Sequence, residues 1–424
     1  MFYASGPVRG ISFGGRWRHS EFVKLWAGQT ISRFGSEISQ LAIPLTAALV
    51  LNASPAQMGL LAAFEFAPFL LLSLLAGVWV DRWPRRPILI VADIGRALLL
   101  GSIPVAAIAG TLRIEQLYLV GILTGTLTVF FDVADQSYLP MLVNREHLVE
   151  GNSKLEMSRS VAQITGPGVA GVLVQVVTAP LAVAVDAASF VASVLFLLFI
   201  RTPEPPPVRH ADGPNSIWGE LRQGLAVVLS NPLLRSIAGC TGTFNLFGNA
   251  MFAVYVLYVT RQLAISPALL GLILAAAGPG ALLGALVAGR VAARFGLGIT
   301  IIGSILIGAL ATLLVPLATG PTVVVAVMLM LAQFIGGFAN PVYNINQVSL
   351  RQAITPDRLQ GRMNASMRFL VWGTIPIGAL LGGALGETFG LRPTLLAMAL
   401  CSLLAPLWIV FSPVRALQVQ PASA

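Results

Sequence analysis

The chain has 424 residues, of which 56% are hydrophobic and 10% are charged, and its formal net charge is +9. A soluble domain carries about 25% charged residues, so this composition excludes a soluble globular protein and indicates an integral membrane protein. The basic residues are spread over short loops between apolar runs rather than gathered on one soluble face, which argues against nucleic-acid binding.

Twelve apolar runs can be drawn along the chain, each near the length of about 20 residues that a spanning helix needs. Arginine and lysine concentrate in alternate loops, which predicts a multi-pass protein of the inner (plasma) membrane with both termini in the cytoplasm. The first run is expected to act as an uncleaved insertion signal. The runs lie at about 22–50, 56–80, 87–110, 116–140, 155–177, 180–201, 232–260, 267–290, 299–319, 322–346, 364–386 and 391–412.

The second half of the chain repeats the first at a constant offset of 212 residues. Ser54-Pro55-Ala56 recurs as Ser266-Pro267-Ala268, and several single residues recur at the same offset. Chance does not give several matches at one offset, so two parallel six-helix halves are expected. The further pairs are Gly59 and Gly271, Gly77 and Gly289, Arg82 and Arg294, Asn152 and Asn364, Gly166 and Gly378, and Gly171 and Gly383.

The segment between the halves differs in composition. Its prolines at 203, 205, 206 and 207 break any helix and indicate a stiff linker. Apolar residues at 217, 221, 225 and 228 then share one helical face, which predicts a short helix on the membrane surface. The expected parts are a cytoplasmic segment at 1–21, the first half at 22–201, the linker at 202–230, the second half at 231–413 and a cytoplasmic tail at 414–424.

A basic turn separates the second and third apolar runs. It carries Gly77, Asp81, Arg82, Arg85 and Arg86. This arrangement resembles the loop between helices 2 and 3 of the major facilitator superfamily, where glycine is followed by Asp-Arg and then by a basic pair. The resemblance implies an all-α fold of twelve transmembrane helices in two halves that rock about a central cavity, with this turn as a gating loop. The alternative is a plain positive-inside hairpin.

Ionisable side chains within the apolar runs are candidates for proton coupling. A charge in a spanning helix costs roughly 2.5–3.5 kcal/mol on insertion scales, so each one invites a functional hypothesis. A carboxylate in an apolar cavity is easily protonated, because its charged form is poorly solvated. Glu65 falls near mid-bilayer without a cation on its own run, so it is the first candidate, and Glu37 and Asp132 follow.

Two arginines in the first half have acids at helical spacing. Arg33 and Glu37 are spaced i, i+4, and they either form a structural ion pair or belong to the transport site. Asp93 and Arg96 are expected to form a structural pair.

Amides take the place of acids in the helices of the second half, where the one acid is Glu387 at the outer mouth. Such side chains suit hydrogen bonding to an organic substrate. No cysteine arrangement typical of a metal site and no phosphate-binding loop is present, so neither a metal nor a cofactor is expected. The residues expected to line the substrate cavity are Arg33, Phe64, Phe69, Asn245, Asn249, Gln333 and Asn340.

The fifth run contains Gly166, Pro167, Gly168, Ala170 and Gly171. It resembles the Gly-Pro-x-x-Gly-Gly signature of drug-efflux antiporters, with Ala170 in place of one glycine. Small residues allow close helix approach, and generic helix packing is the alternative explanation. Those antiporters also carry an arginine in helix 4, whereas 117–138 has none here.

Three further segments are similar to the bacterial macrolide-efflux and enterobactin-exporter branch of the superfamily. They are Leu25-Trp26-Ala27-Gly28-Gln29, Ala42-Ile43-Pro44-Leu45 and 185–190. The resemblance implies a secondary active exporter of a small amphiphilic compound, such as a drug, macrolide or siderophore. Proton antiport is the simplest coupling, and a monomer in the lipid bilayer is expected.

Two alternatives stay open. The first is a nutrient importer by symport or facilitated diffusion, and the second is a non-transporting receptor or assembly factor on the same fold. An enzymatic activity is not expected.

Overall fold

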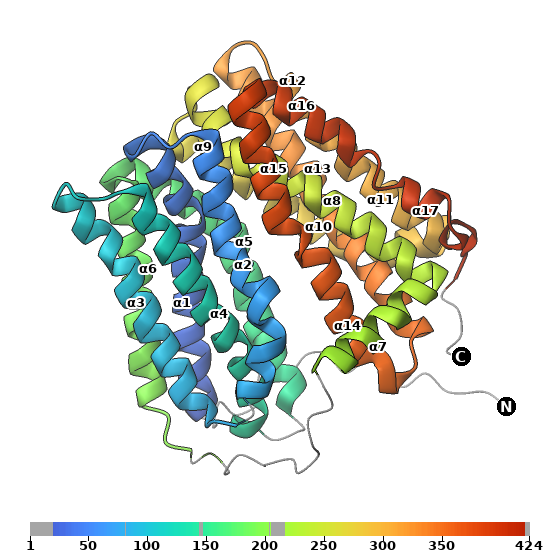
Figure 1. Ribbon diagram of the computed structural model, residues 1–424, viewed down its shortest axis with the longest axis horizontal. Helices are drawn as coiled ribbons and strands as arrows, with labels where there is room; N and C mark the ends of the chain where they lie inside the picture. The colour runs from blue at the N-terminus through green and yellow to red at the C-terminus, as the bar shows by residue number, and fades with distance from the viewer. Residues whose placement is uncertain (1–19, 81, 144–146, 203, 205–216, 420–424) are drawn as a thin grey trace.

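A computed structural model describes residues 20–80, 82–143, 147–202, 204 and 217–419. The described residues are almost entirely helical and contain no strand. Two helix bundles converge at one end, near α9, α12 and α16, and diverge towards α7 and α14 at the other (Figure 1). We call these the α9 end and the α7 end.

The first bundle is built from seven consecutive helical segments. They are α1 (Ser20–Leu45), the π-helical turn η1 (Thr46–Val50), α2 (Pro55–Val80), α3 (Arg85–Ile108), α4 (Ile114–Leu142), α5 (Leu148–Val177) and α6 (Ala179–Leu198).

The second bundle follows the linker helix α7 (Ile217–Ser230). Its segments are α8 (Pro232–Leu257), the π-helical turn η3 (Tyr258–Gln262), α9 (Pro267–Ala275), α10 (Ala277–Phe295), α11 (Leu297–Thr312), α12 (Leu314–Leu317), α13 (Thr322–Ile354), α14 (Asp357–Trp372), α15 (Thr374–Phe389), α16 (Leu391–Ser402), α17 (Leu407–Val410) and η4 (Pro413–Ala416).

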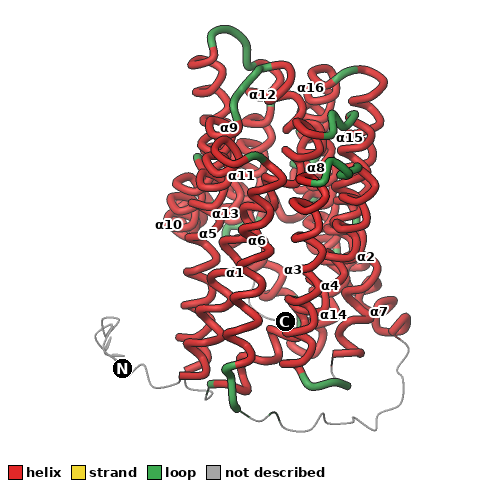
Figure 2. Tube along the Cα trace, turned by 90° about the vertical axis from the view of Figure 1, so that its left-hand side faces the viewer, coloured by secondary structure: helices red, strands yellow, loops and turns green. Residues whose placement is uncertain are grey.

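Eleven segments of the described chain are long and apolar enough to cross a membrane. Consecutive helices such as α9 and α10 form single spans, and the long axes of the spans run side by side (Figure 2). Helix α1 is the remaining span of the fold: it has 26 residues but carries Gln29, Arg33 and Glu37, which lower its hydropathy. The prediction of an all-α membrane protein with two six-helix halves is confirmed.

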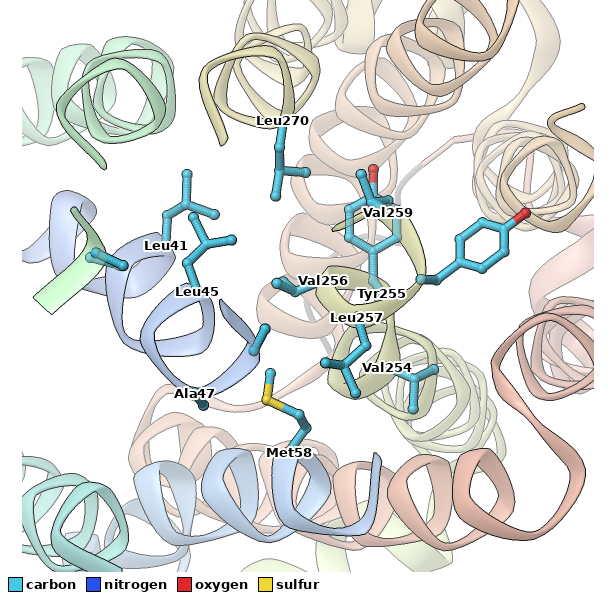
Figure 3. Close-up of a cluster of buried hydrophobic side chains, with 14 of the residues drawn as sticks. Leu41, Leu45, Ala47, Met58, Val254, Tyr255, Val256, Leu257, Val259 and Leu270 are labelled. Atoms are coloured by element: carbon cyan, nitrogen blue, oxygen red, sulfur yellow. The ribbon is translucent and has the colours of Figure 1, made fainter. Parts of the chain in front are cut away.

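The internal repeat is also present in the backbone conformation. The turns η1 and η3 are π-helical at positions that differ by the same 212 residues as the sequence repeat. Each is followed by a residue with positive φ, Asn52 at 51° and Ala264 at 50°. Apolar side chains around the two turns, among them Leu45 and Val259, pack in one core at the α9 end (Figure 3). The two bundles therefore share a hydrophobic core there.

Four glycines bring the bundles into backbone contact at the α9 end. Gly59 of α2 faces Gly383 of α15, and a Cβ at Gly59 would lie 2.8 Å from the Gly383 Cα. Gly171 of α5 faces Gly271 of α9 with the same spacing. The repeat relates Gly59 to Gly271 and Gly171 to Gly383, so the two crossings are pseudosymmetric. Glycine is required here because any side chain would separate the helices.

Two polar contacts also join the bundles at this end. The guanidinium of Arg261 donates from Nη2 to the carbonyl of Ala48 at 2.9 Å. The Ala56 backbone N–H donates to the carboxylate of Glu387 at 3.1 Å, so Glu387 satisfies a free donor at the start of α2. The structure is thus closed at the α9 end by both apolar and polar contacts.

Candidate functional site

A cavity of about 800 Å³ lies within the second bundle. Residues of α8, α11, α12, α13 and α14 line it, from Val315 of α12 to Arg351 near the end of α13. Three of the seven predicted substrate-contacting residues are in its wall: Asn245, Gln333 and Asn340. Aromatic side chains, including Phe244, line the cavity together with these amides. Such a lining suits an organic molecule that has both apolar surface and hydrogen-bonding groups.

Amides form a ladder along the cavity face of α13. The Asn344 side chain donates to Asn340 Oδ1 at 2.8 Å, and the Gln347 side chain donates to Asn344 Oδ1 at 3.2 Å. The spacing of three and four residues places these side chains on one helix face. Gln347 Oε1 is enclosed and accepts no hydrogen bond within the described structure. The ladder therefore fixes the orientation of its amides and leaves an acceptor at its end.

The remaining predicted cavity residues lie elsewhere. Phe64 packs edge-on against Tyr118 within the first bundle, with ring centroids 5.5 Å apart. Phe69 packs against Trp372 of α14 at 6.1 Å, so this pair bridges the bundles. The Asn249 side chain donates to the carbonyl of Asn245 at 2.8 Å and is not in the cavity wall.

A polar cluster occupies the first bundle between α1 and α4. Gln29 and Arg33 share one face of α1, and both reach aspartates of α4. The Gln29 side chain donates to Asp135, and an Arg33 Nη2 atom lies 3.8 Å from Asp132 Oδ1. The Arg33 and Asp132 side chains are 40% and 36% exposed, so this ion pair is partly open to solvent. The side chain of Arg33 thus pairs with Asp132 rather than with Glu37.

Glu37, the second proton-coupling candidate, packs against α5. A Cβ at Gly166 would lie 3.0 Å from the Glu37 Cγ, so the predicted helix 5 motif makes room for this carboxylate side chain. The positive charges that act on the Glu37 carboxylate are those of Arg33 and Arg159. In the same motif Gly171 contacts α9, and Pro167 supplies a carbonyl that faces Gly271.

Glu65, the first proton-coupling candidate, faces α4 rather than the cavity of the second bundle. A Cβ at Gly121 would lie 3.1 Å from the Glu65 Cγ, and one at Gly125 would lie 2.6 Å from the Glu65 carbonyl. Among the described residues no cation forms an ion pair with Glu65. The three predicted coupling acids therefore lie in one bundle, but each contacts a different helix. Glu37 contacts α5, Asp132 contacts α1 and Glu65 contacts α4.

The predicted gating loop is tied to α6 and to the linker. Arg86 donates from Nε and Nη2 to the carbonyls of Leu197 and Leu198, each at 2.9 Å. The backbone N–H groups of Arg85 and Arg86 each donate to the Glu204 carboxylate at 2.6 Å. Glu204 thus supplies an acceptor for two free N–H groups at the start of α3. Gly77 lies in α2 and Arg82 is exposed, while Asp81 falls outside the described residues.

A second ion pair in the first bundle is fully enclosed. Arg96 hydrogen-bonds Asp93, and both side chains are almost completely buried. The guanidinium lies between the rings of Phe131 and Phe190, at 4.2 and 4.3 Å from their centroids. The predicted Asp93–Arg96 pair is confirmed, and its enclosure fits a structural role.

Sequence reasoning missed several residues of the cavity. Tyr255, Tyr343 and Thr241 line it, and the Thr241 and Tyr343 hydroxyls lie 2.7 Å apart. Arg351 and Arg368 also line it, although by sequence they count only as basic residues near the cytoplasmic side. A signal was available for Arg351, since it continues the helical spacing of Asn340, Asn344 and Gln347. Within the described part of the chain, no group of three or more His, Cys, Asp or Glu side chains is placed to hold a metal ion.

Comparison with known proteins agrees with this architecture. The family model described as transmembrane secretion effector matches residues 15–423. The multidrug efflux pump Tap of Mycolicibacterium fortuitum is 28% identical over 375 residues, covering 85% of this chain and 88% of that protein. Macrolide efflux protein A of Streptococcus pyogenes is 26% identical over 227 residues, covering 54% of this chain and 55% of that protein.

A solved structure shows the same fold. A bacterial homologue of the iron transporter ferroportin, in an inward-facing state, superposes with a TM-score of 0.75 at 17% identity. The match covers 92% of this chain and 98% of that one. The resemblance to the major facilitator superfamily and to its macrolide-efflux relatives is thereby confirmed. The chain belongs to the transmembrane secretion effector family of the major facilitator superfamily.

Proposed function

We propose that this protein exports a small amphiphilic organic compound from the cytoplasm by proton antiport. The observation that carries the proposal is the cavity of about 800 Å³ inside the second bundle, lined by amides and aromatic rings. Its volume falls in the range of small-molecule sites, and its lining suits a partly apolar substrate. The efflux functions in the names of the multidrug and macrolide relatives support the outward direction.

The place where the bundles meet supports alternating access. The glycine crossings, Arg261 and Glu387 all close the α9 end, while the basic loop and α7 lie at the opposite end. The positive-inside rule assigns the α7 end to the cytoplasm of the inner membrane, so the substrate enters from that side. Export requires the crossings to separate and the α7 end to close.

Proton coupling is assigned to the first bundle. Glu65 is the first choice because it lacks an ion-pair partner among the described residues, whereas Asp132 is held by Arg33. Glu65 packs against Gly121 of α4 within a membrane-spanning helix, where a charged side chain is costly, and it takes up and releases a proton as its surroundings change. Glu37, packed against Gly166, is the second choice.

Transport into inside-out vesicles tests this proposal. The probes are a radiolabelled macrolide and a panel of fluorescent amphiphilic dyes, and the imposed gradient is acidic inside. Accumulation that collapses with a protonophore supports proton-driven export. Accumulation in right-side-out vesicles alone would indicate an importer, and an absence of uptake of every probe in both orientations would contradict the assignment.

A further inference from the structure

Two arginines face the cavity of the second bundle, and no carboxylate of the described residues forms an ion pair with either of them. Arg351 lies near the end of α13, and Arg368 lies on α14 one turn beyond Asn364. Arg351 Nη2 donates to Asn364 Oδ1 at 3.1 Å, which brings α13 and α14 together at this point. Among the described residues, no carboxylate lines the cavity or forms an ion pair with either arginine.

The two guanidinium groups differ in their surroundings. Arg351 is half-buried, and its Nε is enclosed without an acceptor in the described structure. Arg368 is an exposed residue of the cavity wall, and its guanidinium lies 5.0 Å from the centroid of the Trp372 ring. Trp372 in turn contacts Phe69 of the first bundle, so one aromatic surface borders both halves of the transporter.

Unpaired positive charge is costly at the half-buried Arg351, because the protein surroundings solvate an ion less well than water does. Arginine presents several donors in a planar fork that matches a carboxylate or phosphate group. A membrane-surface anchor would need neither the hydrogen bond to Asn364 nor a position in a cavity wall. The arrangement therefore points to a ligand that brings the missing negative charge.

We propose that Arg351, Arg368 and Asn364 form an anion subsite, and that the substrate is an amphiphile with a carboxylate or phosphate group at one end. The amides of α13 and rings such as Trp372 then contact its uncharged body. This inference rests on the proposed function, because it names the chemical class that the exporter carries. A purely cationic or uncharged amphiphile would leave the arginines unpaired.

Binding of a matched pair of probes tests the subsite. A dansyl-labelled long-chain carboxylate and its uncharged methyl ester are titrated against the full-length protein in nanodiscs of zwitterionic lipid. We expect the carboxylate to bind more tightly than the ester, and Arg368→Gln to weaken carboxylate binding by about tenfold, the size of a hydrogen bond to a charged group. Ester binding should change little in this variant.

Two further variants guard against a folding effect. Arg351→Lys keeps the charge and should retain most of the preference for the carboxylate, whereas Arg351→Gln should lose it. Arg290→Gln is the control, since Arg290 is an exposed arginine of α10 outside the cavity whose side chain donates to the carbonyl of Leu286. Equal binding of the two probes to the wild type, or an unchanged preference in Arg368→Gln, would overturn the proposal.

The same chemistry could come from a lipid headgroup. Nanodiscs with phosphatidylglycerol separate the two sources: loss of carboxylate binding there identifies an anionic lipid as the occupant, and retained binding identifies a substrate. Because these measurements need no transport, they can fail while gradient-driven export of the macrolide or of a dye succeeds. That outcome would reject the anion subsite and leave the proposed export intact.

Discussion

Substituting alanine for Gly171 should shift the protein towards a conformation that is open at the α9 end. A Cβ at this position would lie 2.5 Å from the Pro267 carbonyl oxygen and 2.8 Å from the Gly271 Cα, whereas ordinary contacts are 3.4–4 Å. The obstructing atoms are backbone, so no side-chain rotation relieves the overlap. Helices α5 and α9 must separate for the substitution to be accommodated.

The size of the effect follows from the contact. Overpacking a well-packed site costs about 1–3 kcal/mol. If the crossing exists only in the conformation closed at the α9 end, this cost shifts the ratio of the two conformations by a factor of about 5–150. The substitution does not weaken α5 itself, since alanine is a better helix former than glycine. Loss of the closed conformation should also lower the transport rate.

Double electron–electron resonance, which measures the distance between two spin labels, can report this shift. Spin labels at Thr111 and Thr319 lie on exposed loops of the two bundles at the α9 end, in a background where Cys240 and Cys401 are replaced. We expect a larger long-distance population in Gly171→Ala.

Gly168→Ala is the matched control on the same helix, because its Cβ would lie 3.7 Å from the Ala275 Cβ, an ordinary contact. An unchanged distance distribution in Gly171→Ala, with normal folding, would refute the role of the crossing.

Three other changes test separate parts of the structure. Arg96→Ala should lower the free energy of unfolding by about 3–5 kcal/mol, because Asp93 would be left buried without its cation; thermal unfolding in detergent measures this, and an unchanged melting temperature would contradict it. Arg86→Ala should reduce transport more than Arg294→Ala, because Arg86 holds two carbonyls at the end of α6 whereas Arg294 lies over its neighbouring phenylalanine; equal losses in vesicle assays would indicate that both act only as positive-inside anchors. Glu387→Gln should open the α9 end less than the glycine substitution does, as it weakens only exposed hydrogen bonds at the start of α2; a larger effect in the same spin-label assay would be inconsistent with this ranking.

The architecture could be predicted from the sequence because the features that indicate it extend over many residues. Apolar runs and the 212-residue repeat do not depend on any single residue. The π-helical turns at Thr46–Val50 and Tyr258–Gln262 could not be predicted, since the two stretches share no residue pattern and differ in polarity. Their similarity arises from equivalent positions in the two halves, which is a property of the tertiary structure.

The site was predicted in part. Residue type and helical spacing identified the amides Asn245, Gln333 and Asn340, which the structure brings together in one cavity. The same reasoning could not show that Phe64 packs against Tyr118, or that Arg33 pairs with Asp132 of another helix rather than with Glu37 four residues away. Those outcomes depend on which helices are neighbours, and a single sequence does not contain that information.

The central claim is that a proton gradient drives export through a carboxylate of the first bundle. The most direct test compares wild type and Glu65→Gln in inside-out vesicles, with gradient-driven accumulation measured beside exchange without a gradient. The amide keeps the size of the side chain between α2 and α4 but cannot release a proton at neutral pH. We predict that the wild type accumulates substrate, and that Glu65→Gln exchanges it without accumulating it. Accumulation by Glu65→Gln at the wild-type level would contradict the assignment of Glu65, and wild-type transport that ignores the gradient would contradict proton coupling itself.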